Sequence, residues 1–534
     1  MCLPKGGNGL ARSPPSHRLS LPRAGPERRL GRKHLRPDLP DRRGSWDEAT
    51  IPPLAELTMT SPDPSHAAQA TLRPALQAAL QAALQAEAAG DRETAKALCR
   101  DVLESAGTGS ADRLAAHDAL ARLLVGEDMA AAAGHALAAW RLTPQDPTRR
   151  SNLWQLLTHL GEAGDVARFR GRDDCVGLVA LGNALRRDGQ GLRAERAYRR
   201  ALELYPEVSF TLSRLACLCA EQHRLEEADA LFLQAAERHG GRDGVTRTAP
   251  AFLQSLREAP PPAGIRATLA EGAGSADRPL VVYASCDAVY ARKFLPTMVR
   301  SIVEDSGLDC AIALHLINPD AEAEATVSAL AAAHGAGRFI VLRETIDLTP
   351  LGGDAKTYYA CSRFLVLPDL LARWKRPVLM LDVDLLAIRD LTPLLATSAQ
   401  SDLGMMSHAL KRLDIWSLLY ADVLHIRPTI GALRFLDLTR RYIRHFLDRG
   451  MPVWFLDQAA LAAVYLAGFT AESAPRLTVY PADIHSSTVM VDGEGRYWTD
   501  DSAYFYSVRA TGGGQHAVHR LKRRAGTTAD VKPG

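Results

Sequence analysis

Apolar residues recur with a helical period between about residues 70 and 242, in a stretch rich in alanine and leucine. Such a period predicts amphipathic helices. The same stretch also has a longer period of 34 residues, after which one set of apolar and small residues is repeated. The first set is Leu181, Gly182, Leu185, Ala194, Tyr198 and Ala201, and the second is Leu215, Ala216, Cys219, Ala228, Phe232 and Ala235. Small residues allow two antiparallel helices to approach and an aromatic ring fills the gap between pairs, so the pattern predicts stacked helical hairpins.

This 34-residue pattern resembles the tetratricopeptide repeat, most specifically over 175–208 and again over 209–242. Weaker units precede it, one of which ends at Pro144. The resemblance implies a right-handed solenoid of four or five hairpins over 66–245. Its concave face would bind a protein partner or support oligomerisation. The alternative is that the hairpins only support the neighbouring domain.

After residue 245 the pattern changes. Proline and glycine punctuate 246–278, which we interpret as a linker. Over 279–510 short apolar runs alternate with helical stretches, which predicts an α/β domain. The predicted strands are 279–285, 310–318, 338–344 and 377–384, and the predicted helices are 291–306, 321–335 and 362–374. The run at 377–384 is apolar on both faces and is expected to be a central strand.

The two ends of the chain have no such period. Residues 1–65 are rich in Arg, Pro, Gly and Ser, and their composition predicts disorder. Alternatively, the segment 1–58 lies upstream of a start at Met59. Residues 511–534 form a basic tail that we interpret as a solvated run of charge.

Composition narrows the class of protein. The chain has 534 residues, 47% of them hydrophobic and 23% charged, which is typical of a globular protein with more than one domain. A net charge of +3 argues against a nucleic-acid partner. The eight cysteines form no CxxC pair, which favours reduced, buried thiols. No run approaches the roughly 18 apolar residues of a transmembrane helix, and there is no secretory signal, so we expect a cytoplasmic protein.

Candidate chemistry lies in "KRPVLMLDVDLLAIRDL", residues 375–391. In an extended strand, residues i and i+2 point to the same side, so Asp382 and Asp384 would converge at the carboxyl end of a strand, where open α/β sheets bind ligands. Two neighbouring carboxylates repel each other unless a cation lies between them. Mg²⁺ or Mn²⁺ prefers such oxygen ligands and also binds diphosphates. The motif therefore predicts a metal ion and, through it, a nucleotide diphosphate.

The setting of this motif resembles the core of GT-A glycosyltransferases, most closely family 8 and its relatives. The matching residues are Tyr359, Arg363, the helix from Phe364, Asp382, Asp384 and Asp390-Leu391, with Asp287, Tyr290 and Ser301 upstream and Asp457-Gln458 downstream. The resemblance covers about 280–510. It implies a Rossmann-like domain with a mixed sheet, placed after the all-α repeats.

The resemblance also implies a role for each matching residue. Asp382 and Asp384 would hold Mn²⁺ or Mg²⁺. Asp287 would bind the nucleoside, on whose base Tyr290 would stack. Lys356 and Arg363 would bind the phosphates, and Asp457 and Gln458 would orient the sugar during catalysis. The activity implied is transfer of a sugar from a nucleotide diphosphate sugar, UDP-linked in this family, to a protein or saccharide acceptor. The anomeric configuration would be retained.

The sequence departs from the family in two places. Asp422 stands where the family has asparagine or glycine, and no H-x-x-G-x-x-K-P-W segment supplies a histidine ligand. His485 is the nearest candidate; His516 and His519 lie in the basic tail. These departures favour one alternative, a tetratricopeptide adaptor with an inactive GT-A-like domain. A second alternative is a phosphohydrolase of the haloacid-dehalogenase type, whose first aspartate is a nucleophile.

Structural roles compete with the functional ones. Asp390 would cap the helix that starts near Thr392. Tyr290 could pack in the core, and Arg363 and Lys356 could form surface salt bridges.

Overall fold

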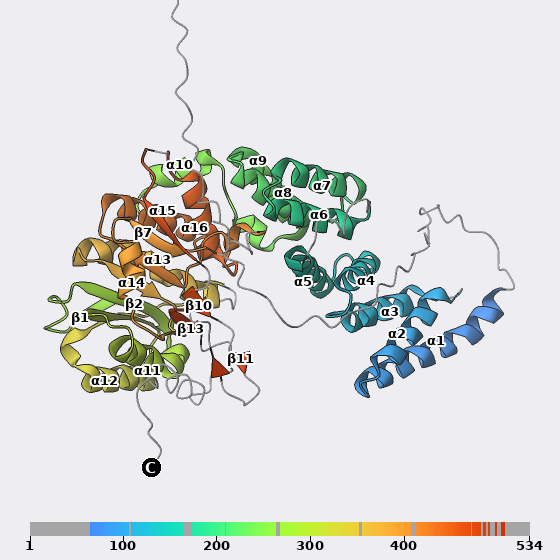
Figure 1. Cartoon of the computed structure of the whole chain (residues 1–534), viewed down its shortest axis with the longest axis horizontal. Helices are drawn as coiled ribbons and strands as arrows, with labels where there is room; N and C mark the ends of the chain where they lie inside the picture. The colour runs from blue at the N-terminus through green and yellow to red at the C-terminus, as the bar shows by residue number, and fades with distance from the viewer. Residues whose placement is uncertain are drawn as a thin grey trace, which may run out of the picture. The chain divides into compact units, whose positions relative to one another are not determined.

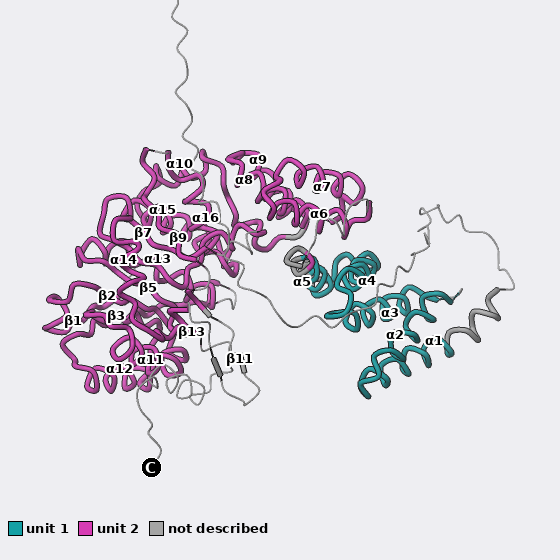
Figure 2. The backbone as a smooth tube through the Cα atoms, viewed as in Figure 1, with its two compact units in different colours: residues 1–157 teal, residues 158–534 magenta. Residues whose placement is uncertain are grey.

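The structure is a computed structural model that describes most of residues 65–507. The described ranges are 65–105, 108–163, 173–208, 210–262, 267–351, 355–407, 413–470, 472–481, 484–486, 490–491, 497–498 and 503–507. The predicted disordered segment and the basic tail, with His516 and His519, lie outside them. The chain divides into two compact units, 1–157 and 158–534 (Figure 2).

Unit 1 is helical. Its elements are α1 (Ser65–Ala88), α2 (Arg92–Glu104), α3 (Ser110–Leu123), α4 (Met129–Leu142) and the first part of α5 (Pro147–Ala163). Aspartates begin two of these helices: Asp91 accepts the Thr94 N–H before α2, and Asp128 accepts the Ala130 and Ala131 N–H groups before α4. Such caps satisfy the free backbone donors of a first turn.

Unit 2 begins with two helical hairpins at the positions expected from the 34-residue period. They are α6 (Cys175–Arg187) with α7 (Gly191–Leu204), and α8 (Phe210–Glu221) with α9 (Leu225–His239). Gly182 allows the first pair to approach: a Cβ atom there would lie 2.4 Å from Cε1 of Tyr198. The Tyr198 hydroxyl donates to Asn183 Oδ1 at 2.7 Å. The hairpin geometry follows the small–aromatic pattern, while the tetratricopeptide solenoid itself stays a prediction.

A short connection follows, made of the 3₁₀ turn η2 (Gly241–Val245) and α10 (Pro250–Glu258). The segment that we interpreted as a linker also contains a strand, β1 (Ala267–Glu271), which pairs antiparallel with β4 (Phe339–Glu344). This segment therefore supplies an edge strand to the main sheet.

The main sheet has eight strands in the order β1-β4-β3-β2-β5-β8-β7-β9. The strands not yet given are β2 (Leu280–Asp287), β3 (Cys310–Ile317), β5 (Val378–Leu381), β7 (Leu403–Met406), β8 (Val423–Ile426) and β9 (Leu477–Tyr480). Strands β4, β3, β2 and β5 run parallel, and β8 runs antiparallel to both β5 and β7. The predicted central strand, β5, lies between β2 and β8, so unit 2 holds a mixed α/β sheet.

The remaining elements complete unit 2 (Figure 1). The helices are α11 (Ala288–Glu304), α12 (Ala321–His334), α13 (Ala355–Trp374), α14 (Thr392–Thr397), α15 (Ile430–Leu447) and α16 (Leu456–Ala467), with the 3₁₀ turns η3 (Ala336–Arg338), η4 (Thr349–Leu351) and η6 (Ile415–Ser417). The short strands are β6 (Leu385–Ala387), β10 (His485–Ser486), β11 (Met490–Val491), β12 (Tyr497–Trp498) and β13 (Phe505–Ser507). A small second sheet has the order β10-β13-β6.

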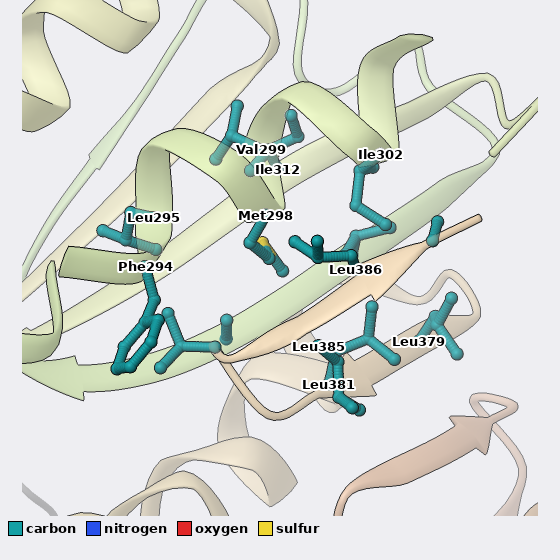
Figure 3. Packing of buried hydrophobic residues seen from close by; sticks show 14 of the residues in the cluster. Phe294, Leu295, Met298, Val299, Ile302, Ile312, Leu379, Leu381, Leu385 and Leu386 are labelled. Carbon is teal, nitrogen blue, oxygen red and sulfur yellow. The ribbon is translucent and has the colours of Figure 1, made fainter. Parts of the chain in front are cut away.

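Strand β2 shows how the two faces of the main sheet are covered. Its residues Val282, Ala284 and Cys286 belong to a buried apolar cluster with α11, and Figure 3 shows Met298 and Ile302 of α11 close to Leu386 of β6. The alternate residue Tyr283 lies instead near Trp374 of α13, with ring centroids 6.5 Å apart. Alternate residues of a strand point to opposite faces, so α11 and α13 cover opposite sides of the sheet.

In the part of the chain that the structure describes, no helix combines the length and the apolar character needed to cross a bilayer.

Candidate active site

The two aspartates of the motif lie in a turn after β5, at the carboxyl edge of the parallel strands. The strand ends at Leu381, and the Leu385 N–H donates to the Asp382 carbonyl at 3.1 Å, which closes the turn. The prediction that the strand extends through the motif is therefore wrong, because the backbone turns directly after Leu381. The Asp382 N–H donates to the Asp422 carbonyl at 2.9 Å, which places Asp422 beside the motif.

Arg363 joins two of the predicted site residues. The residue is 7% exposed, and its guanidinium contacts Asp382 Oδ1 and donates to Asp457 Oδ2 at 3.2 Å. Burial acts to lower the pKa of Arg363, but the two carboxylates outweigh burial and the pKa is raised. The expected surface salt bridge is thus a buried one that connects α13, the turn after β5 and the first turn of α16.

A buried polar network holds α13 against the sheet one residue before Arg363. Ser362 Oγ lies 2.9 Å from Ser285 Oγ, and Ser285 Oγ lies 3.2 Å from His315 Nδ1. His315 Nε2 is 3.0 Å from Glu344 Oε2, and the Tyr358 hydroxyl donates to the other oxygen of Glu344. The network fixes the helix that carries Arg363. Sequence reasoning missed it, because its members are spread over β2, β3, β4 and α13.

His485, the nearest candidate for the family's histidine ligand, pairs with Asp422, which departs from the family pattern. His485 Nδ1 lies 2.9 Å from Asp422 Oδ2. Within the described residues, the outer atoms of this pair, Asp422 Oδ1 and His485 Nε2, are buried and take part in no hydrogen bond. Buried polar atoms without partners are costly, so they point to a ligand. The sequence signals were the departure at Asp422 and the absence of the family's histidine segment, for which His485 was the nearest candidate.

The electrostatics of the site favour a cation. Burial raises the pKa of Asp382 to about 6, Arg363 opposes that rise, and Asp384 and Asp422 add to it. Burial acts to lower the pKa of His485, but Asp422, Asp382 and Asp384 outweigh it and the pKa is raised. Asp384 and Asp422 thus add negative charge beside Asp382, and a cation bound there would relieve their repulsion.

The remaining predicted residues lie around this edge in structural contacts. Asp287 ends β2 and accepts the Tyr290 N–H at 2.8 Å, so it caps α11. The half-buried Tyr290 ring packs edge-on against Phe294, with centroids 5.0 Å apart. Lys356 is exposed in the first turn of α13.

Three further residues have defined contacts. The Gln458 N–H donates to Asp457 Oδ1 at 2.9 Å in the first turn of α16. Ser301 is buried and its Oγ accepts the Ala387 N–H at 3.1 Å, which ties α11 to β6. Asp390 accepts the Thr392 N–H at 2.8 Å before α14, so it has the capping role that the sequence suggested.

The residues present suit a hard divalent cation by their chemistry. Within the described ranges, no set of three or more His, Cys, Asp or Glu side chains is arranged to hold a metal ion. Asp382, Asp384 and Asp422 nevertheless offer oxygen ligands of the kind that Mg²⁺ and Mn²⁺ prefer. The unpartnered Asp422 Oδ1 and His485 Nε2 are the structural observation that favours a ligand here.

Comparison with known proteins gives the following. No protein-family model and no curated protein matches the chain. Solved structures of glycosyltransferases are among those similar to part of it. The apo structure of the bifunctional glycosyltransferase WbbM is 12% identical over 46% of this chain and 52% of that chain, with a TM-score of 0.29. The galactosyltransferase LgtC, in complex with donor and acceptor sugar analogues, is 16% identical over 47% of this chain and 97% of that chain, with a TM-score of 0.29.

Mouse xyloside xylosyltransferase 1, in its apo form, is 10% identical over 42% of this chain and 96% of that chain, with a TM-score of 0.27. The chain spans about half the length of the WbbM structure. Similarities with TM-scores this low do not indicate the function of this chain, so its function is inferred from its own residues.

Proposed function

We propose that unit 2 is a metal-dependent glycosyltransferase that uses a nucleotide diphosphate sugar, UDP-linked in our proposal. The observation that carries the proposal is the pair of Asp422 and His485 beside Asp382, at the carboxyl edge of β5, in which Asp422 Oδ1 and His485 Nε2 are buried and take part in no hydrogen bond within the described residues. The motif resemblance to family 8 supports the same assignment. The acceptor, a protein or a saccharide, is part of the proposal.

The proposed metal, Mn²⁺ or Mg²⁺, would be held by Asp382 and Asp384, with His485 as a third ligand. Its chemistry when bound is to neutralise charge that develops on the diphosphate. Asp422 would orient His485 through the 2.9 Å contact to Nδ1, as carboxylates do for metal-bound histidines.

The other residues have proposed roles in donor binding. Asp287 and Tyr290 would bind the nucleoside beside the end of β2. Arg363 would bind the phosphates together with Lys356. Asp457 and Gln458, at the start of α16, would orient the sugar. In the described structure Arg363 instead bridges Asp382 and Asp457. Donor binding would therefore free part of the Arg363 guanidinium to contact the phosphates.

The deciding experiment is isothermal titration of the full chain with UDP, in Mn²⁺ and in EDTA. We expect UDP to bind in Mn²⁺ and its affinity to be at least tenfold lower in EDTA. This is a loss of about 1.4 kcal/mol in binding free energy. A double variant with Asp382→Asn and Asp384→Asn should lose the metal dependence. Asp390→Asn is the matched control, because Asp390 lies in the same segment but caps α14.

The same titration distinguishes the proposed transferase from the alternative, a tetratricopeptide adaptor with an inactive domain. That alternative draws on the contact of Arg363 with Asp382, which already neutralises part of the motif. Equal UDP affinity in Mn²⁺, in EDTA and in the double variant would contradict metal dependence. No binding of UDP or GDP in any condition would favour the adaptor, whose helical repeats would recruit a protein partner.

A further inference from the structure

The last helical hairpin reaches the candidate active site through η2. Arg242, in this 3₁₀ turn, places its guanidinium carbon 4.6 Å from the centroid of the Phe455 ring and 5.4 Å from that of Trp416. These distances are within the range of attractive cation–π contacts, which strengthen when the cation is desolvated. Arg242 is half-buried, and burial lowers its pKa. Arg242, which follows the last helical hairpin, therefore contacts both the Trp416 ring and the Phe455 ring.

Phe455 has an unusual backbone. Its φ angle is +74°, in the left-handed region, and it is the residue immediately before α16. Bulky residues rarely adopt this conformation, and they keep it only where the surroundings hold them. The Phe455 carbonyl accepts the Ala459 N–H at 2.9 Å, and its ring packs against Trp454 with centroids 5.5 Å apart. The contact with Arg242 holds the same ring from η2.

The position of Phe455 sets the start of α16. Asp457 lies two residues later and receives the hydrogen bond from Arg363, which also contacts Asp382. A shift of the Phe455 backbone would therefore move Asp457 relative to Arg363 and the motif.

The turn η6, which carries Trp416, is also bound to the helical hairpins. Arg214 Nη1 of α8 lies 2.7 Å from Asp414 Oδ1, immediately before η6, and both side chains are buried. Arg186 Nη1 of α6 donates to the Leu413 carbonyl at 3.0 Å. Losing one partner of a buried ion pair is strongly destabilising, so η6 is firmly held against α6 and α8. Arg242 thus connects a fixed turn to the strained start of α16.

We propose that Arg242 is a positioning residue for the candidate active site, holding Phe455 in its left-handed conformation so that Asp457 meets Arg363. The last two hairpins then act as a part of the catalytic framework, in addition to any recruitment of partners. The consequence for catalysis rests on the proposed function. The positioning of α16 does not, and it can be measured without any substrate.

The test is hydrogen exchange of the full chain followed by mass spectrometry, comparing wild type with Arg242→Ala and Arg242→Lys. We expect amides in peptides covering 453–461 to exchange about tenfold faster in Arg242→Ala. Arg242→Lys should lie between, because lysine keeps the charge but loses the planar guanidinium. Peptides covering β2 and β3 should be unchanged. Arg238→Ala is the matched control, because Arg238 is exposed on α9 and its described contact is to the Pro206 carbonyl.

Two results would overturn the inference. One is unchanged exchange at 453–461 in Arg242→Ala. The other is equally faster exchange in every peptide, which would show a general loss of stability. UDP titration of the same variants separates this inference from the proposed function: if wild type binds no UDP, the transferase proposal fails while the exchange result still decides the positioning role. If wild type binds UDP-sugar and hydrolyses it, Arg242→Ala should lower kcat more than it changes KM.

Discussion

At the scale of single residues, Asp243 is a buried acid outside the candidate site. It lies in η2 beside Arg242, and its Oδ1 has no hydrogen-bond partner within the described residues. Burial raises its pKa to about 7, and Asp414 adds to the rise, while Arg214 and Arg242 oppose it. In the sequence, "GGRDGV" is typical of an exposed turn, so its burial could not be predicted.

Asp243→Asn should therefore stabilise the protein increasingly as pH rises. The folded pKa of about 7 lies above the ordinary value of 3.8, so the folded chain binds this proton more tightly than the unfolded chain does. Stability from this group is present at low pH and is lost between about pH 4 and 7. Urea unfolding at pH 5 and pH 8 should show a gain on the order of 1 kcal/mol or more for the variant at pH 8.

The control for this experiment is Asp390→Asn. The backbone N–H of Thr392 lowers the pKa of Asp390, so this exposed group should not titrate between pH 5 and 8. Its effect on stability should be the same at both pH values. An equal effect of Asp243→Asn at both values would contradict a raised pKa.

At the scale of elements, the hairpin α6–α7 shows why the 34-residue pattern could be read from the sequence. Helical periodicity is local, and Gly182 and Tyr198 recur as Ala216 and Phe232 in α8 and α9. The turn after β5 could not be read in the same way. Asp382 and Asp384 alternate with an apolar residue, which is also the pattern of a strand, yet the backbone turns there and the Leu385 N–H donates to the Asp382 carbonyl.

Gly182→Ala should destabilise α6–α7, because the added Cβ would lie 2.4 Å from the Tyr198 ring. Overpacking of this kind costs about 1–3 kcal/mol. Thermal or urea unfolding followed by circular dichroism would measure it. Gly191→Ala is the control: its Cβ would lie 2.9 Å from the flexible end of Gln222 and at an ordinary 3.7 Å from Leu218 Cδ1, so a change within about 0.5 kcal/mol is expected. Similar losses for both variants would contradict the close approach.

At the scale of the whole molecule, the last two helical hairpins and the α/β sheet lie in one compact unit. Within unit 2 every residue of α8 from Phe210 to Ala220 is buried, and the Arg214–Asp414 pair joins that helix to η6. The Tyr442 hydroxyl of α15 donates to the Val245 carbonyl at 2.7 Å and accepts the Arg247 N–H at 2.7 Å. The sheet domain and the last two hairpins therefore share one buried interface.

Truncation tests this directly. A chain of residues 173–534 should fold and unfold cooperatively, because it keeps α6–α9. A chain of residues 246–534 should be insoluble or lose its cooperative transition, because Asp414 would lose Arg214 and the surface under α8 would be exposed. Calorimetry of both chains would decide, and equal transition temperatures would show that the hairpins are dispensable.

The sequence by itself determined the local elements and most of the candidate chemistry. Period and apolar runs predicted the hairpins and the parallel strands, since these signals depend on neighbouring residues only. The motif resemblance selected Asp382, Arg363 and Asp457, which do meet, although Arg363 and Asp457 are 94 residues apart. Only the tertiary structure decided that Asp422 pairs with His485, that β1 completes the sheet and that Arg242 reaches Phe455. Such contacts depend on topology and register, which local patterns do not encode.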